Sequence, residues 1–199
     1  MNEQELQWAG DFGTQYAARS PGDVESNGVM FARVIASMDS DPKTVVEFGA
    51  GMGSNLRALR KILPQAVLSG VEINEVAFGN MRDIATIAYQ MSMLQFAERD
   101  AYDLAFTKGV LVHIPPADLA RAYEVLYQAS RRYILIAEYF APKLTEIEYR
   151  GRRGLLWKGP HAYDMLDRWK DLKLVDYWFV SSRDAFPQDD LNVWLLSKV

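Results

Sequence analysis

The sequence predicts an α/β protein with an open, mostly parallel sheet of seven strands and helices on both faces. Three observations predict this fold class. Short apolar or β-branched runs alternate with amphipathic segments of helical period, which is the pattern of β-α-β units. The last two apolar runs have no helix between them, so we expect them to pair antiparallel, with the last strand reversed. The length of 199 residues suits one domain.

Seven segments have the apolar, β-branched or aromatic character of strands. They are residues 44–48, 67–72, 87–91, 102–106, 132–138, 172–180 and 192–196. The segment 87–91 is the weakest of them, whereas 132–138 is apolar enough to lie in the middle of the sheet.

The segments with helical spacing of their apolar residues lie between and before these strands. They are residues 3–19, 24–38, 54–62, 74–84, 117–129 and 161–170. In the first of them, Trp8, Phe12 and Tyr16 recur every fourth residue on one face. The turn residues 20–23 end that helix. Residues 139–160 show no regular pattern, and we expect a long irregular segment there.

The composition excludes several kinds of function. The sequence has no cysteine, which excludes disulfides, thiolate metal sites and cysteine nucleophiles. Residues 1–6 are acidic and polar, unlike a signal peptide, and no apolar run approaches the ~18 residues of a membrane span. The net charge of -4 lacks the basic footprint of proteins that bind long nucleic acids. We therefore expect a cytoplasmic enzyme without membrane contact.

The glycine-rich segment 47–53 follows the first strand and leads into a helix. Glycines permit positive φ and carry no Cβ, so a ligand can approach the backbone there. The dinucleotide pattern G-x-G-x-x-G fails, because its third glycine would fall on Ser54 or Leu56. The phosphate-loop pattern fails because no lysine follows before Lys61. The remaining pattern, E-x-G-x-G-x-G, resembles the first motif of class I S-adenosylmethionine-dependent methyltransferases, whose fold is Rossmann-like.

Glu72 ends the second strand, 23 residues after Gly49. A carboxylate at this place can accept hydrogen bonds from both hydroxyls of a ribose. Glu72 therefore supports an adenosine ligand without distinguishing the two cofactor classes, and the glycine spacing makes that distinction. The reading of Glu47 and Glu72 as ordinary surface charges is weaker, because both fall at strand ends.

The segment 103–115 resembles the part of a methyltransferase in which the fourth strand opens toward the methyl donor. His113 can serve there as a base for an acceptor hydroxyl or ammonium, or it can merely support a loop. Lys108 can contact the cofactor carboxylate or an acidic acceptor, or it can be solvated. We take His113, Lys108 and Tyr16 as the candidate catalytic residues.

The resemblance to class I methyltransferases implies S-adenosylmethionine as cofactor and a set of residues around it. These are Phe12, Tyr16, Arg19, Glu47, Gly49, Ala50, Gly51, Gly53, Asn55, Glu72, Ile73, Ser92, Met93, Leu94, Thr107 and Lys108. Many class I enzymes carry an acidic residue after the third strand that bonds adenine. Here Ser92-Met93-Leu94 stands instead, so we expect backbone groups and apolar contact to hold the adenine.

From Trp8 to Lys198 the chain also resembles one small family, the methylases associated with pseudaminic-acid biosynthesis. The matching segments are residues 8–13 with Tyr16 and Arg19, then 70–74, 106–114, 133–139, 149–151 and 186–190. Ser20 departs from the family, where asparagine is expected. The resemblance implies a modified or nucleotide-linked carbohydrate as methyl acceptor.

Two further regions have more than one interpretation. Trp8, Phe12 and Tyr16 can be core packing or a lid that excludes water, and the resemblance favours the lid. The basic run 149–154 can clamp a phosphate or carboxylate, bind nucleic acid or be a solvated loop. Its position after the fifth strand favours the clamp. The candidate acceptor-binding residues are Glu138, Tyr139, Tyr149, Arg150 and Asp189, with Asp190 beside them.

Residues 1–199 are therefore predicted to form one methyltransferase domain. It comprises a helical lid (1–38), a cofactor-binding core (44–138) and an acceptor-side segment with the last two strands (139–199). The predicted reaction methylates a hydroxyl or amine of a small molecule, a sugar or nucleotide-linked sugar, without a metal. The alternatives are a non-catalytic S-adenosylmethionine sensor and a nucleic-acid or protein methyltransferase. The N/D-P-P-Y signature of adenine methylation is absent after the fourth strand, where residues 107–110 read T-K-G-V.

Overall fold

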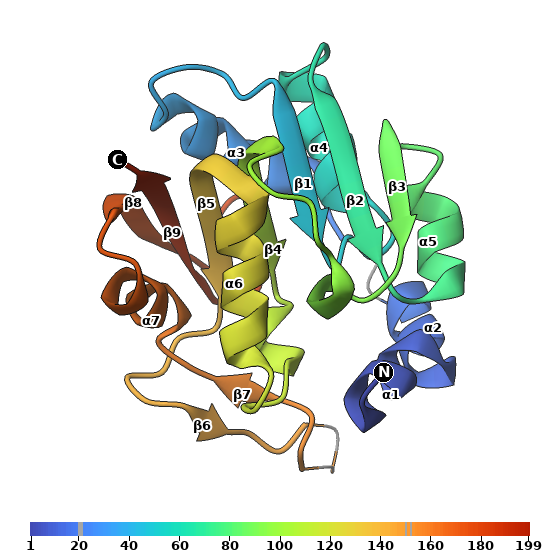
Figure 1. Cartoon of the computed structure of the whole chain (residues 1–199). Coiled ribbons are helices and arrows are strands. Elements are labelled where there is room, and N and C mark those ends of the chain that lie inside the picture. Colours follow the sequence, from blue (N-terminus) through green and yellow to red (C-terminus); the bar gives the residue numbers. More distant parts are fainter. Residues whose placement is uncertain (20–21, 150, 152) are drawn as a thin grey trace.

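The apolar segments of the chain form one seven-stranded sheet in a computed structural model that describes residues 1–19, 22–149, 151 and 153–199. The strand order is β3-β2-β1-β4-β5-β9-β8 (Figure 1). The strands are β1 (Thr44–Phe48), β2 (Val67–Glu72), β3 (Ile87–Gln90), β4 (Tyr102–Lys108), β5 (Ser130–Glu138), β8 (Leu172–Val180) and β9 (Leu191–Lys198).

The pairing of the strands confirms the predicted mostly parallel sheet. β1 pairs in parallel with β2 and with β4. The pairs β2–β3 and β4–β5 are parallel as well. β9 runs antiparallel to both of its neighbours, β5 and β8. The order reverses between β1 and β4, because the chain first builds outward through β2 and β3 and then returns. In open parallel sheets such a reversal leaves a crevice beyond the carboxyl ends of the strands.

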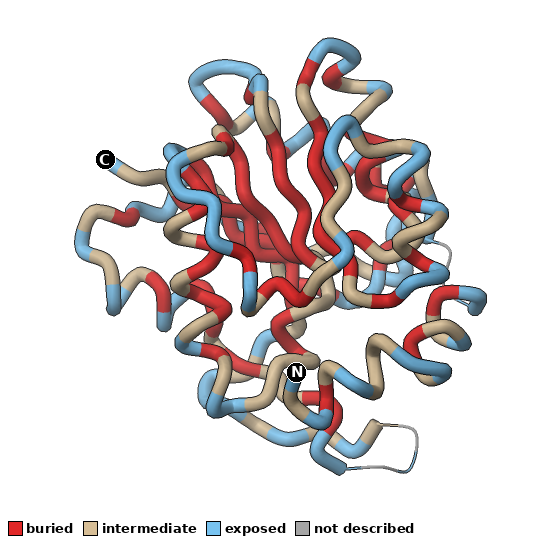
Figure 2. The backbone as a smooth tube through the Cα atoms, turned by 45° about the vertical axis from the view of Figure 1, so that its right-hand side comes forward, coloured by how far each residue is buried: buried red, intermediate tan, exposed pale blue. Residues whose placement is uncertain are grey.

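Helices cover both faces of the sheet, as predicted. They are α1 (Glu3–Ala9), α2 (Asp11–Arg19), α3 (Val24–Ala36), α4 (Ser54–Ile62), α5 (Glu75–Met81), α6 (Leu119–Ala129) and α7 (His161–Arg168), with the 3-10 turns η1 (Met93–Gln95) and η2 (Leu111–His113). Apolar residues of α3, α4 and α5 form one core with the sheet, which includes Phe31 and Leu59. Those of α6 and α7 form a second core on the other face, which includes Leu126 and Trp194. Figure 2 shows the central strands as the buried middle of the molecule.

The prediction of one helix over residues 3–19 was wrong, because Gly10 separates α1 from α2. The backbone of Gly10 is extended (φ -93°, ψ -155°), and its N–H caps the carbonyl of Leu6. The three aromatic residues still lie together although they belong to two helices, since the ring of Trp8 lies 5.2 Å from those of both Phe12 and Tyr16. The two helices lie beyond the carboxyl ends of β2 and β3 (Figure 1).

The segment 139–160, for which no regular structure was expected, contains a small antiparallel pair of strands. β6 (Thr145–Glu146) pairs with β7 (Trp157–Lys158). Two residues per strand are too few to produce a recognisable alternation of polar and apolar residues. The other predicted elements differ from the observed ones by a few residues at their ends. Within the described ranges, no helix is long and apolar enough to cross a membrane.

Candidate active site

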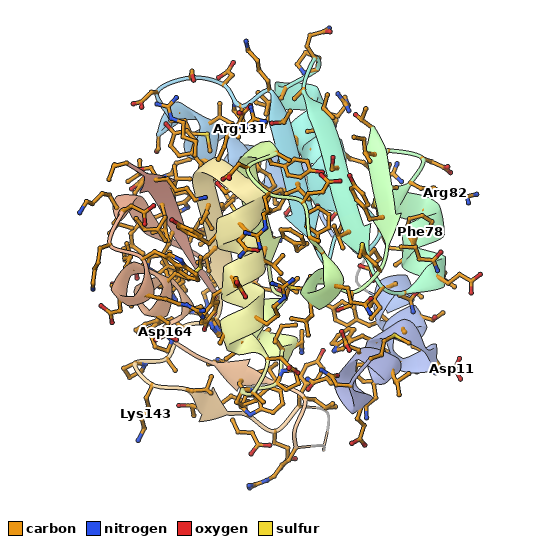
Figure 3. The ribbon with its side chains drawn as sticks, in the orientation of Figure 1. Asp11, Phe78, Arg82, Arg131, Lys143 and Asp164 are labelled. Atoms are coloured by element: carbon orange, nitrogen blue, oxygen red, sulfur yellow. The ribbon has the colours of Figure 1, made fainter. Side chains whose placement is uncertain are left out.

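A cavity of about 560 Å³ opens at the carboxyl edge of the sheet, where the strand order reverses. Figure 3 separates the two edges of the sheet: Arg131, at the start of β5, lies at the opposite end of the molecule from Lys143, beyond the end of that strand. The cavity is lined by the ends of β1, β2 and β4 and covered by residues of α1 and α2. The predicted site residues among its lining are Tyr16, Glu47, Gly49, Ala50, Gly51, Asn55, Glu72, Ile73, Ser92, Met93, Leu94, Lys108, His113 and Asp189.

The glycines of the loop between β1 and α4 have different structural roles. Gly49, Gly51 and Gly53 all have positive φ (69°, 53° and 78°), a conformation that side chains with a Cβ rarely adopt. A Cβ on Gly49 would lie 2.5 Å from Val110, and one on Gly53 would lie 2.6 Å from Ile84. A Cβ on Gly51 would meet no atom within 4 Å. Gly49 and Gly53 therefore permit close packing, while Gly51 leaves open space in the wall of the cavity.

Glu47 and Asn55 form a buried polar pair in this wall. Glu47 is 1% exposed and Asn55 is 7% exposed. The amide nitrogen of Asn55 donates to Oε1 of Glu47 at 2.6 Å. Oε2 of Glu47 and Oδ1 of Asn55 have no hydrogen-bond partner among the described residues. Burial raises the pKa of Glu47 to about 8, although the charge of Lys108 opposes this rise. When Glu47 is ionised, the pair presents two acceptors that have no partner among the described residues and that suit an ammonium group.

Glu72 closes the glycine loop from the end of β2. Its Oε2 accepts a hydrogen bond of 2.7 Å from the N–H of Gly51, and its Oε1 accepts one of 2.8 Å from the N–H of Asn74. Burial raises the pKa of Glu72, and these two N–H donors lower it. An ionised carboxylate has about four acceptor positions, so each oxygen retains capacity for one hydroxyl donor.

The turn after β3 supplies an apolar wall. Ser92 and Met93 are buried, and the hydroxyl of Ser92 accepts a hydrogen bond from the N–H of Leu94 at 3.1 Å. The guanidinium of Arg121, on α6, donates to the carbonyl of Leu94 at 3.1 Å and fixes the turn. Ile73 lines the cavity with these residues. The wall offers apolar side chains and backbone groups to a flat heterocycle.

His113 lies in the cavity lining, with its ring 4.5 Å from the ring of Trp8 and 5.6 Å from that of Tyr149. Its Nδ1 lies 2.8 Å from the carbonyl oxygen of Leu155. Because a carbonyl only accepts hydrogen bonds, Nδ1 carries the proton. Burial lowers the pKa of His113 to about 4, so the ring is neutral near pH 7 and Nε2 holds a free electron pair. His113 thus has the electronic form of a proton acceptor.

Lys108 lies between several carboxylates at the end of β4. Burial lowers its pKa, while the charges of Glu47, Asp189 and Glu138 raise it. Asp189 also accepts a hydrogen bond from the hydroxyl of Tyr139. The hydroxyl of Tyr16 is close enough to interact electrostatically with that of Tyr139. Burial, together with Asp189, raises the pKa of Tyr139 above its usual range. The structure therefore brings residues of β4, β5, α2 and the β8–β9 turn together at one end of the cavity.

Several predicted site residues lie outside the cavity lining. Phe12 packs on Trp8, Arg19 is exposed at the end of α2, and the ring of Tyr149 lies 5.6 Å from that of His113. Asp190 accepts hydrogen bonds from Ser181 and Ser182 in the β8–β9 turn. Gly53, Thr107 and Tyr139 were also predicted and also lie outside the cavity lining. Arg150 falls outside the described residues.

Glu138 was predicted to touch the acceptor, but its side chain is fully buried behind the β4 loop. Its Oε1 accepts hydrogen bonds from the N–H groups of Val110 and Leu111, at 2.9 and 3.0 Å. These bonds shape the turn that leads to His113. Glu138 therefore supports the site from behind and does not face the cavity.

Five cavity residues that were not predicted from the sequence are amides: Asn2, Gln4, Asn27, Asn74 and Gln188. Gln188, in the β8–β9 turn, donates to Asn27 of α3 at 3.0 Å. Such a contact joins residues 161 positions apart, and no local pattern reveals it. Asn74 had a sequence signal, because it precedes α5 as a capping residue and belongs to the segment 70–74.

Solved structures similar to this chain are methyltransferases. Magnesium protoporphyrin IX methyltransferase from Synechocystis, with bound S-adenosylhomocysteine, superposes with a TM-score of 0.73 and 15% identity over 99% of this chain and 100% of its own. The sugar N-methyltransferase from a Streptoalloteichus species gives 0.66 and 14% over 95% and 93%. The 1,6-didemethyltoxoflavin-N1-methyltransferase from Burkholderia thailandensis gives 0.65 and 18% over 95% and 81%.

Comparison by sequence is less extensive. No family model matches the chain. A tRNA (guanine-N(7)-)-methyltransferase from Legionella pneumophila is 29% identical over 102 residues, which are 51% of this chain and 40% of that protein. The chain thus matches less than half the length of this curated relative. Taken with the topology, the structural likeness shows the class I S-adenosylmethionine-dependent methyltransferase fold.

Proposed function

We propose that this protein is an S-adenosylmethionine-dependent methyltransferase that methylates a hydroxyl or amine of a small molecule. The observation that carries the proposal is a pair of acceptors, Oε2 of Glu47 and Oδ1 of Asn55, that have no partner among the described residues and lie in the cavity wall beside Gly51. Buried polar atoms without a partner are rare in proteins, and such atoms beside a cavity indicate a polar ligand.

Residues of the cavity supply groups suited to the ammonium, the ribose and the adenine of the cofactor. Glu47 and Asn55 would accept hydrogen bonds from its ammonium group, and Glu72 would accept those of the ribose hydroxyls. The wall of Ser92, Met93 and Leu94 would contact the adenine. When bound, S-adenosylmethionine supplies a methyl group that is already activated for transfer.

The protein's own contribution is to orient the acceptor, exclude water and accept a proton. Trp8 and Tyr16, from α1 and α2, cover the cavity and limit the access of water. Nε2 of His113 would accept a proton from the acceptor hydroxyl or ammonium. Lys108, Tyr16 and Asp189 lie where they would orient the acceptor. Positioning of this kind supplies much of the rate in a reaction whose donor is already activated.

We further propose a sugar or nucleotide-linked sugar as the acceptor. The resemblance to the methylases associated with pseudaminic-acid biosynthesis supports this, as does the similarity to a sugar N-methyltransferase structure. The proposed acceptor-side residues are Tyr139, Tyr149 and Asp189, together with Arg150, which lies outside the described residues.

Incubation with methyl-deuterated S-adenosylmethionine and a panel of acceptors tests the proposal. The panel contains nucleotide-linked amino sugars, their free sugars and bulk tRNA, and accurate mass identifies the labelled product. A labelled sugar supports the proposal. Label in tRNA alone would favour the activity named for the Legionella relative. Cofactor binding without a labelled product from the panel or from cell extract would favour a sensor.

A further inference from the structure

Asn74 is a buried residue that contacts three parts of the molecule: its side chain bonds to α5 and to the break between α1 and α2, and its backbone N–H bonds to Glu72. It stands two residues beyond β2, is 3% exposed and precedes α5. Its Oδ1 accepts hydrogen bonds from the N–H groups of Val76 and Ala77, both at 3.1 Å, and so caps α5. Its backbone N–H donates to Oε1 of Glu72 at 2.8 Å.

The amide nitrogen of Asn74 faces the end of α1. Nδ2 lies within hydrogen-bond distance of the carbonyl oxygens of Trp8 (3.1 Å), Ala9 (3.3 Å) and Gly10 (3.2 Å). It also lies 3.1 Å from the hydroxyl of Thr14, on α2. Two N–H hydrogens are thus shared among four acceptors. The carbonyl groups at the end of a helix have no partner within the helix and need a capping group or water. Asn74 supplies hydrogen-bond donors to these carbonyls where α1 ends and α2 begins.

The helical cover, residues 3–19, is built closely against this amide. A Cβ on Gly13 would lie 1.9 Å from the carbonyl oxygen of Trp8 and 3.1 Å from Nδ2 of Asn74. Trp8, whose carbonyl Asn74 holds, places its ring 4.5 Å from that of His113. Asn74 therefore connects the cover to Glu72 through its own backbone N–H and, through Trp8, to the proposed base.

We propose that Asn74 is a positioning residue that couples the ribose-binding carboxylate of Glu72 to closure of the helical cover. This inference rests on the proposed function for the identity of the ligand. The side chain must accept on one side and donate on the other, which an asparagine amide does and an aspartate does not. Because one residue holds Glu72 through its backbone N–H and the cover through its side-chain amide, cofactor binding and ordering of residues 3–19 stabilise each other.

The variant Asn74→Asp separates the two functions of the side chain, which are capping of α5 and donation to the carbonyls at the end of α1. Aspartate caps a helix N-terminus as well as asparagine does, so α5 should remain intact. Its second oxygen would face three carbonyls and repel them. The matched control is Asn80→Asp, which makes the same change of charge on the exposed side of the same helix, outside the cavity lining.

Two measurements on the full chain test the coupling. Hydrogen exchange should become faster over residues 3–19 in Asn74→Asp and stay unchanged over 75–81. Calorimetry should show a Kd for S-adenosylhomocysteine raised about tenfold, with Asn80→Asp like the wild type. Wild-type exchange over 3–19, or a wild-type Kd, in Asn74→Asp overturns the coupling.

A second variant guards against misfolding of the first. Asn74→Ser keeps a short capping oxygen for α5 and removes the donor toward α1. Equal acceleration of exchange over 3–19 and 75–81 in both variants would reduce Asn74 to a cap of α5 and would overturn the proposal. If the wild type bound no S-adenosylhomocysteine, the proposed function would fail, while the exchange measurement would still decide whether Asn74 holds the cover.

Discussion

The amide of Asn55 donates a 2.6 Å hydrogen bond to one oxygen of Glu47 and leaves a second acceptor on each residue without a partner among the described residues. An unsatisfied buried acceptor destabilises a protein by about 1–3 kcal/mol. The arrangement is therefore unfavourable without a ligand and becomes favourable when a donor such as an ammonium group arrives. In the described structure the side chains of Glu47 and Asn55 hydrogen-bond only to each other, with the charge of Lys108 nearby, so ligand binding accounts best for their open acceptors.

The pKa of Glu47, raised to about 8, makes cofactor affinity depend on pH. Below pH 8 the free protein holds a proton on Glu47, and a bound ammonium group favours its loss. Affinity for S-adenosylhomocysteine should therefore rise by up to about tenfold per pH unit between pH 6 and 8 and then level off. Calorimetry in buffers of different ionisation enthalpy should detect the released proton at pH 7.

The control for this pH dependence is Glu47→Gln, which keeps the hydrogen bond from Asn55 and removes the titrating group. Its affinity should be weaker and nearly independent of pH from 6 to 8. A Glu47→Gln variant that retained the wild-type pH dependence would assign the effect to another group.

Gly51→Ala should weaken cofactor binding roughly ten- to hundredfold, because the added methyl enters space that no protein atom occupies. Gly154→Ala is the matched control: Gly154 also has positive φ (76°), its Cβ position meets no atom of the described residues within 4 Å, and it lies outside the cavity lining. Both variants should lose similar stability in urea. Equal affinities for the two variants would show that the space beside Gly51 is not ligand space.

His113→Ala should lower kcat by about 10²–10⁴-fold and leave the Kd for S-adenosylhomocysteine within a few-fold of the wild type. Because burial lowers the pKa of His113 to about 4, wild-type kcat should show no loss from this residue as the pH falls through 6.5. Single-turnover kinetics over pH 5–9 measures both quantities. Unchanged turnover in the variant would restrict His113 to supporting the Leu155 loop.

Glu138 should support the site through folding of the β4 loop. Glu138→Ala leaves the N–H groups of Val110 and Leu111 without their acceptor, so urea denaturation should show a loss of about 1–3 kcal/mol. Glu138→Gln retains an acceptor oxygen and should lose less. If the alanine variant were as stable as the glutamine variant, these hydrogen bonds would contribute nothing measurable.

The same buried carboxyl predicts a pH dependence of stability. Burial raises the pKa of Glu138 to about 7 from its ordinary value of 4.5. The folded protein then holds a proton that the unfolded chain releases, so this contribution is complete below pH 4.5 and is lost as the pH rises through 7. The free energy of unfolding of the wild type, relative to Glu138→Gln, should fall over that interval. An unchanged difference would contradict the raised pKa.

The sheet was predictable because its signals are local. β1 and β2 are apolar runs bounded by turn residues, and the glycine spacing after β1 distinguishes one cofactor class from two others. The break at Gly10 was missed because Trp8, Phe12 and Tyr16 keep helical spacing across it.

The roles of other residues depend on contacts between distant segments. Nδ1 of His113 meets the carbonyl of Leu155, 42 residues away, and Glu138 turns its carboxylate inward to a loop 28 residues earlier. Asn74 reaches carbonyls 64 to 66 residues before it. Local residue patterns carry no information about such pairs, so the sequence indicates these residues without specifying their tasks.

Calorimetric titration of the full chain with S-adenosylhomocysteine tests the central claim most directly. We expect one molecule bound per chain, together with a marked loss of affinity in Gly51→Ala and none in Gly154→Ala. No binding at millimolar ligand, or binding that Gly51→Ala leaves unchanged, would contradict the assignment of this cavity to the methyl donor.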